Sequence, residues 1–340
     1  MAGFFKRLRF HLAGGITNTS KYEARCAALE KKYAKYISLK QTPNLLRYQE
    51  LAIQIATPRR QSGLSKKKWK AMKKEFARLR KSAEVLDFFK LQRSSNSFHE
   101  ILRWELTFED TFAGTELNNA KWTPRPALIG AATEIMYSPS DENHLYTNGG
   151  NLAVGGNMLK ILVKREQASG IGFNDQVGFA PIERKYTSGI VSTAQSHVQQ
   201  YGKVEAKICF HRLEKGLYHS MWLGTGKRLP HVNVLRIGSK IEFSAFAEKS
   251  DGAGERQHVE TWKRSLLKQN TPYVVTIEWS KEVMIWKING VTLFSAPNIV
   301  DEPVYIAFSS GVTGNPRLFS PAALEVCWVR GYKPHDVTPA

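Results

Sequence analysis

The stretch Tyr201-Gly202-Lys203-Val204-Glu205-Ala206-Lys207 decides the fold class of most of this chain. From Lys203 to Ile208 each charged side chain is followed by an apolar one. A period of two is typical of a β-strand with one face in water and the other packed against a core. The stretch therefore predicts a strand at the surface of a β-protein.

Segments of similar character recur from about Leu102 to the end of the chain, separated by Gly, Asn, Pro and Ser. They are Leu159–Lys164, Val204–Phe210, Ile241–Ala247, Tyr273–Trp279, Val283–Ile288, Val304–Ser309 and Ala323–Val329. Asn289-Gly290 between two of them is a strong signal for a β-hairpin. Because no long helical pattern interrupts them, residues 99–340 are predicted to form an all-β sandwich or barrel. Trp279 and Trp286 are expected in its core.

Residues 1–98 have a different, helical pattern. Lys21–Lys40 and Leu45–Ala56 contain neither Gly nor Pro, and apolar residues recur in the first at spacings of three and four. Pro43 precedes the second segment at a position that a first helical turn tolerates. A third helix is expected from Ser65, a plausible N-cap. Ser94–Ser97 resembles a short polar hinge, so the predicted domains are 1–98 and 99–340.

Positive charge is concentrated in the helical region. The 340 residues carry 49 Lys and Arg against 30 Asp and Glu, a net charge of +19. Residues 1–100 contain 23 of the basic and 7 of the acidic residues, so nearly all of the excess belongs to them. The third helix is either a solvated face packed on a neighbour, or an electrostatic anchor to something acidic: nucleic acid, an anionic membrane surface, or an acidic partner or protein assembly. No motif for sequence-specific nucleic-acid recognition is present.

Other classes of function lack their usual signals. Cys26, Cys209 and Cys327 are far apart, which argues against a disulfide framework and a zinc site. The histidines likewise show no compact ligand spacing; they include His197, His211, His219, His231 and His258. We therefore expect neither a metal nor a cofactor. No apolar run is long enough for a transmembrane helix, and Met1–Phe10 does not follow the pattern of a secretory signal.

Several segments, in order, resemble the family 16 glycoside hydrolases, the laminarinase-like β-jelly rolls of the concanavalin-A type. They are Phe108–Leu117 with Lys121-Trp122, Glu142 with Tyr146-Thr147 and Asn151, Tyr186–Gly189, Tyr201–Lys207, Gly216–Gly224, Thr276–Trp279 and Val326–Tyr332. The likeness covers about residues 104–333. It implies a jelly-roll sandwich with a cleft that recognises polysaccharide. On this resemblance the carbohydrate-binding residues are Trp222, Asn151, Glu242, Tyr218 and His219.

The resemblance also implies a catalytic motif, Glu-x-Asp-x-x-Glu, on one strand. Its two glutamates act as nucleophile and acid/base, and a retaining mechanism requires them about 5–5.5 Å apart. The segment aligned with it is Gly238–Ala245, in which Lys240, Glu242 and Ala245 take the three positions. An ammonium group cannot attack the sugar as a carboxylate does, and a methyl group cannot transfer a proton. The motif is therefore degenerate, with no catalytic pair intact.

Three functions follow from these observations. The first is a carbohydrate-binding module that has lost catalysis and is tethered by the basic helices. The second is a structural component of a phage virion or an injection-type particle, since such a particle is released without an export signal. The third is an active endo-β-glycanase in which a displaced carboxylate, such as Glu205, Glu214 or Glu260, completes the pair. The glycan itself is not predicted.

Overall fold

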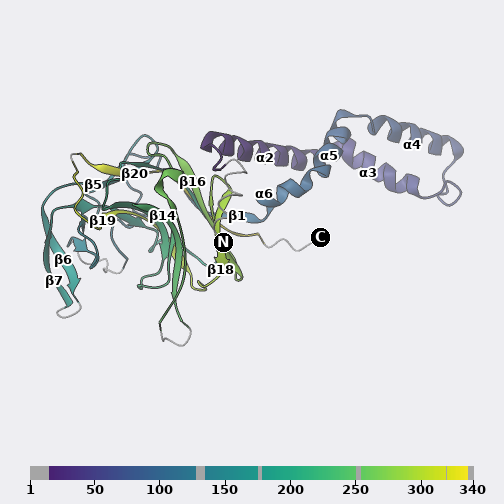
Figure 1. Cartoon of the computed structure of the whole chain (residues 1–340). Coiled ribbons are helices and arrows are strands. Elements are labelled where there is room, and N and C mark those ends of the chain that lie inside the picture. The colour runs from purple at the N-terminus through teal and green to yellow at the C-terminus, as the bar shows by residue number, and fades with distance from the viewer. Residues whose placement is uncertain (1–14, 128–134, 175–177, 250–253, 319, 336–340) are drawn as a thin grey trace. The chain divides into compact units, whose positions relative to one another are not determined.

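The computed structural model describes residues 15–127, 135–174, 178–249, 254–318 and 320–335. Met1–Phe10, for which the sequence indicated no secretory signal, lies outside these residues. The described chain divides into two compact units: a helical unit over Ser20–Arg103, and a β unit over Trp104–Pro334 that also includes residues 15–19 (Figure 1). None of the helices in the described residues combines the length and hydrophobicity that a membrane span requires.

The helical unit confirms the prediction of helices ahead of the sandwich. Its elements are α2 (Thr19–Lys40), α3 (Pro43–Ala56), α4 (Lys66–Leu79), α5 (Ala83–Arg93), the 3-10 helix η1 (Ser95–Phe98) and α6 (His99–Leu102). Pro43 opens α3, and the Ser65 hydroxyl caps α4 by accepting a hydrogen bond from the Lys68 amide. The expected polar hinge at 94–97 is instead helical, because the Ser94 and Ser97 hydroxyls bond to carbonyls three residues earlier.

Apolar and aromatic contacts hold α3, α4 and α5 together. Tyr48 of α3 stacks on Phe76 of α4 with ring centroids 4.7 Å apart. Beside this pair the Arg47 guanidinium donates to both carboxylate oxygens of Glu75, at 3.0 and 3.1 Å. Leu45, Leu51, Leu79, Val85 and Phe88 are buried within the unit. The apolar stripe of α4 therefore packs on α3. This packing agrees with the interpretation of the basic helix as a solvated face packed on a neighbour.

The β unit is built from two large sheets and one smaller sheet. The eight-stranded sheet has the order β18 (Val291–Pro297), β17 (Val283–Ile288), β16 (Tyr273–Trp279), β11 (Gly202–His211), β20 (Ala322–Pro334), β5 (Leu159–Val163) and β4 (Leu152–Val154), with β1 (Trp104–Asp110) on β20. The seven-stranded sheet has the order β10 (Val198–Gln199), β19 (Val304–Val312), β12 (Leu217–Gly224), β13 (His231–Ile237), β14 (Lys240–Glu248) and β15 (Glu255–Lys263), with β9 (Ile190–Ser192) on β19.

The five-stranded sheet is made of β7 (Gly178–Arg184), β6 (Ala168–Asn174), β2 (Tyr137–Ser138), β3 (Leu145–Tyr146) and β8 (Thr187–Ser188). A short 3-10 helix, η2 (Arg264–Leu266), follows β15. Asn289 and Gly290 both have positive φ and join β17 to β18, as the hairpin signal predicted. The all-β sandwich predicted from the sequence is confirmed.

The core lies between the two large sheets. Val204, Ala206 and Ile208 of β11 are buried in the same apolar cluster as Met221 of β12 and Phe243 of β14. Trp279 and Trp286 are also buried in this cluster, in agreement with the expectation for both. Because side chains alternate across a strand, the residues between these positions point to the other face of each sheet. On the seven-stranded sheet, that other face forms the candidate site.

Candidate functional site

A β-bulge on β13 determines which side chains reach the outer face of the seven-stranded sheet. Asn233 is paired with Ser244 of β14, but the next pair joins Arg236 to Glu242. Two residues of β13, Val234 and Leu235, therefore oppose one residue of β14, and both are buried. The extra residue returns Arg236 to the same face as His231 and Asn233. Because of the bulge, the residues of β13 that share this face are spaced i, i+2 and i+5.

The neighbouring strand β12 contributes by simple alternation. Tyr218, Ser220 and Trp222 line a cleft on this face, whereas Met221 lies in the core. The cleft has a volume of about 300 Å³. Its described lining is Pro126, Ala127, Tyr137, Pro139, Ser140, Glu142, Tyr146, Ile190, Tyr218, Ser220, Trp222, His231, Asn233, Arg236, Tyr305 and Ser309. A second hollow of about 300 Å³ shares Pro126, Ala127 and Tyr305 with it, so the cleft continues as a groove.

Asn233 is the centre of a hydrogen-bond network at the base of the cleft. Its amide nitrogen donates to Glu242 Oε1 at 3.2 Å and to Ser244 Oγ at 2.9 Å. Its amide oxygen accepts from Ser220 Oγ at 3.3 Å and lies 3.2 Å from His231 Nε2. Because an amide oxygen can only accept, His231 Nε2 carries the proton in that bond. Burial lowers the pKa of His231, so the imidazole is neutral at pH 7.

A second group of side chains connects Glu142, Tyr218 and Arg236. The Tyr218 hydroxyl donates to Glu142, with oxygens 2.6 and 2.7 Å away, and the Arg236 guanidinium carbon lies 4.1 Å from the Tyr218 ring centroid. Burial raises the pKa of Glu142 to about 7. His144 Nδ1 is 3.3 Å from Glu142 Oε2, but burial lowers the pKa of His144 to about 3. The histidine is therefore neutral at pH 7, and this contact is not an ion pair there.

Aromatic rings form one side of the cleft. Trp222 is partly exposed, and its indole nitrogen donates to Ser309 Oγ at 3.2 Å. Its ring centroid lies 4.9 Å from that of His231 and 5.6 Å from that of Tyr305. These contacts fix the orientation of the indole while leaving part of it open to a ligand.

Comparison with solved structures decides the fold. The chain is similar to the catalytic domain of an endo-1,3-β-glucanase (laminarinase) from Thermotoga petrophila RKU-1, with a TM-score of 0.53 and 17% identity over 68% of this chain and 99% of that one. The endo-β-1,3-glucanase of Pyrococcus furiosus gives a TM-score of 0.52 and 20% identity over 68% of this chain and 95% of that one. The β unit has the laminarinase-like jelly-roll fold. No protein-family model and no curated protein matches the sequence.

Two of the predicted carbohydrate-binding residues, Trp222 and Tyr218, line the cleft of the laminarinase-like jelly roll. Glu242 does not line the cleft itself, but it accepts a hydrogen bond from Asn233, which does. Asn151 is buried, and its side-chain amide bonds to Leu162 O, Thr187 Oγ1 and Thr147 Oγ1. His219 is also buried, because alternation along β12 turns it away from the cleft towards Ser310 and Arg212.

The three residues that were aligned with the catalytic motif do not share one face of β14. On β14, Lys240 is exposed and Glu242 is half-buried, whereas Ala245 is fully buried in the core of the laminarinase-like jelly roll. Lys240 and Ala245 are five residues apart on a strand whose pairing with β15 has no bulge, so they point to opposite faces. The three positions therefore do not form one site.

Sequence reasoning missed the residues that do share the cleft, namely His231, Asn233, Arg236, Glu142 and Tyr305. One signal was available, because His231-x-Asn233-x-x-Arg236 has the spacing of the motif. It was hidden because none of the three residues is acidic, whereas the next strand contains Glu242. The displaced carboxylates considered earlier, Glu205, Glu214 and Glu260, are not among the described residues that line the cleft.

Proposed function

We propose that the cleft binds a β-linked polysaccharide without cleaving it. One observation carries this proposal: on the cleft face of β13 the spacing of Glu-x-Asp-x-x-Glu is reproduced by His231, Asn233 and Arg236. The scaffold that would present two acids to a sugar is retained, and the acids are replaced. The similarity in fold to laminarinases supports a polysaccharide as the ligand class.

The chemistry of the three side chains explains the loss of hydrolysis. A retaining mechanism needs one ionised and one protonated carboxyl about 5–5.5 Å apart. His231 offers a neutral imidazole in place of a carboxylate nucleophile, an amide at residue 233 neither attacks nor transfers a proton, and the Arg236 guanidinium stays protonated at all working pH values. Among the described residues that line the cleft, Glu142 is the only carboxyl. A single carboxyl cannot supply both roles.

The remaining side chains suit a neutral sugar. Pyranose rings present C–H groups that stack on an indole face, and Trp222 offers such a face beside Tyr305. Ser220, Asn233 and Arg236 add hydroxyl, amide and guanidinium groups that can bond to sugar hydroxyls. A mostly apolar wall with a few convergent polar groups is typical of small-ligand sites. The groove shared by the two hollows gives space for more than one sugar ring.

Calorimetric titration with laminarin, a soluble β-1,3-glucan, tests the proposal. The native chain should bind, and Trp222→Ala should reduce the affinity by about two- to tenfold, since stacking contacts of this kind contribute about 0.5–1.5 kcal/mol. Trp328→Ala is the matched control, because Trp328 lies on the eight-stranded sheet and is absent from the cleft. Equal loss in both variants, or no binding by the native chain to any β-glucan, contradicts the proposal.

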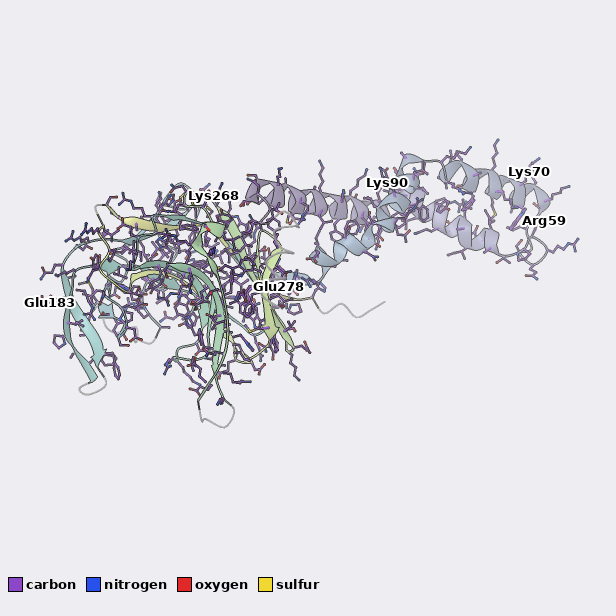
Figure 2. The ribbon with its side chains drawn as sticks, viewed as in Figure 1. Arg59, Lys70, Lys90, Glu183, Lys268 and Glu278 are labelled. Atoms are coloured by element: carbon purple, nitrogen blue, oxygen red, sulfur yellow. The ribbon has the colours of Figure 1, made fainter. Side chains whose placement is uncertain are left out.

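We also propose that α4 attaches the chain to an acidic protein surface. Its lysines at 66, 67, 68, 70, 73 and 74 are all exposed, while the opposite stripe packs on α3 through Phe76. Figure 2 shows Lys70 extending away from its helix. A cluster of positive charges attracts polyanions, and the strength of this attraction falls steeply as the salt concentration rises.

Retention on immobilised polyglutamate tests this second proposal. Replacing Lys67, Lys70 and Lys74 by Glu should abolish retention at physiological salt, whereas replacing the same three by Arg should preserve it. Unchanged retention of the Glu variant would show that α4 is only a solvated face.

A further inference from the structure

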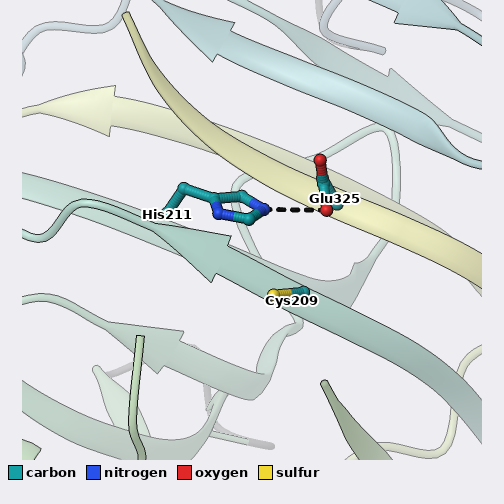
Figure 3. A group of neighbouring side chains, drawn as sticks. All are labelled: Cys209, His211 and Glu325. Atoms are coloured by element: carbon teal, nitrogen blue, oxygen red, sulfur yellow. Dashed lines mark ion pairs between the residues drawn. The ribbon is translucent and has the colours of Figure 1, made fainter. Parts of the chain in front are cut away.

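Three metal-binding side chains meet on the eight-stranded sheet, on the face that is turned away from the core. Cys209 and His211 are two residues apart on β11, and Glu325 of β20 is paired directly with Cys209. Figure 3 shows the three side chains directed towards one another. Cys209 is buried and the other two are half-buried. The cluster shares no residue with the cleft, which is built on the seven-stranded sheet.

The ligand atoms of the cluster are close enough together for one metal ion to contact all three. One ligand atom from each residue, the Cys209 sulfur, a His211 ring nitrogen and a Glu325 carboxylate oxygen, lies within 4.8 Å of the other two. His211 Nε2 is already 2.7 Å from Glu325 Oε2. Zinc bonds to sulfur, nitrogen and oxygen are about 2.0–2.3 Å long, so small side-chain rotations bring all three atoms to one centre.

Both outer ligands are held from behind by neighbouring side chains. Asn270 Oδ1 lies 2.6 Å from His211 Nδ1 and can only accept, so Nδ1 is the donor to Asn270, and Nε2, which faces Glu325, is the ring nitrogen that a metal would take. Lys160 binds Glu325 through Oε1 at 2.9 Å, which leaves Oε2 facing the histidine. Partners that fix the tautomer of a histidine and orient a carboxylate are the usual surroundings of metal ligands.

From this geometry we infer that Cys209, His211 and Glu325 bind one zinc ion. Thiolate and imidazole ligands favour zinc over calcium and magnesium, which prefer oxygen alone. Three protein ligands leave a fourth position of the tetrahedron for water. The spacing of the cysteines and histidines in the sequence had argued against zinc, because the third ligand comes from a distant strand. This inference is independent of the glycan proposal.

Metal binding to the reduced full-length chain tests the inference. Equilibrium dialysis with Zn²⁺ alone, followed by elemental analysis, should give one ion per chain, and Co²⁺ in its place should show a thiolate-to-cobalt charge-transfer band. Cys209→Ser and Glu325→Gln should each weaken Zn²⁺ binding by more than about 100-fold, and Asn270→Ala by about 10–100-fold. Cys26→Ser, on α2, should leave binding unchanged and is the matched control.

Thermal unfolding separates loss of the site from loss of the fold. Because zinc binds the folded chain, it should raise the melting temperature of the native protein and of Cys26→Ser, and not that of Cys209→Ser or Glu325→Gln. Melting of each variant without metal reports whether it is folded. If Cys209→Ser is unfolded, Glu325→Gln still decides the question. Failure of the native chain to retain Zn²⁺, or undiminished binding by folded Cys209→Ser and Glu325→Gln, would overturn the assignment.

Discussion

The Arg236 guanidinium lies over the ring of Tyr218, 4.1 Å from its centroid, and the hydroxyl of the same tyrosine donates to Glu142. One aromatic ring thus separates a permanent cation from a partly buried carboxyl. The cation lies on β13, and the carboxyl comes from the connection between β2 and β3. This arrangement makes the electrostatics of the cleft testable through Glu142.

Glu142 should make the protein less stable as the pH rises from about 4.5 to about 7. Burial raises its pKa in the folded state from 4.5 to about 7, so the folded chain binds a proton that the unfolded chain has released. Glu142→Gln removes this titrating carboxyl and with it the pH dependence that it causes. Relative to the native chain, the variant should therefore gain about 3 kcal/mol of unfolding free energy between pH 4.5 and pH 7.

Urea unfolding at several pH values measures that difference directly. The comparison with the variant matters because His144, whose pKa burial lowers to about 3, contributes a slope of opposite sign between pH 3 and pH 6.5. A difference between the two proteins that does not change with pH would show that Glu142 is solvated like an ordinary surface carboxyl.

Gly311 should be essential for the position of Tyr218. A Cβ added at Gly311 would lie 2.6 Å from His144 Cε1 and from Tyr218 Cε1 and Oη. Gly311→Ala should therefore destabilise the protein by about 1–3 kcal/mol and weaken glycan binding, because Tyr218 must move. Gly155→Ala is the control, since a Cβ there meets nothing within 4 Å. Equal stability of the two variants in urea unfolding would contradict this reading.

Asn233 should not tolerate replacement by the acid that the motif would require. Asn233→Asp would place a carboxylate where the amide nitrogen now donates to Glu242 Oε1 at 3.2 Å. Repulsion and the lost hydrogen bonds should lower the unfolding free energy by about 1–3 kcal/mol at pH 7. Adding Glu242→Gln should recover most of this loss in a double-mutant cycle. Additive effects in the cycle would mean that the two side chains do not interact.

Local patterns were sufficient to predict most of the fold. The alternation at Lys203–Ile208 and the Asn289-Gly290 turn both arise from neighbouring residues, and both were predicted correctly. Trp222 and Tyr218 were predicted in the cleft from the family resemblance, and alternation along β12 explains why both line it while His219 does not. The stretch 94–97, interpreted from its polar residues as a hinge, is largely the 3-10 helix η1, because serine hydroxyls can also bond within a helical turn.

The remaining residues of the site could not be predicted, because their positions depend on strand pairing that no short stretch of sequence indicates. The bulge that returns Arg236 to the face of Asn233 arises from pairing with β12 and β14, which the sequence of β13 does not specify. The sequence alignment therefore followed the acidic residue Glu242 to β14, and the cleft-facing residues of β13 were not considered. In the same way, Cys209, His211 and Glu325 come together only because β11 pairs with β20.

The most direct measurement is prolonged incubation of the purified chain with laminarin under conditions where titration detects binding, followed by an assay for new reducing ends. Binding with no reducing ends above a protein-free control is the predicted result. Release of oligosaccharides by the native chain that disappears in Glu142→Gln would contradict a cleft that binds without cleaving.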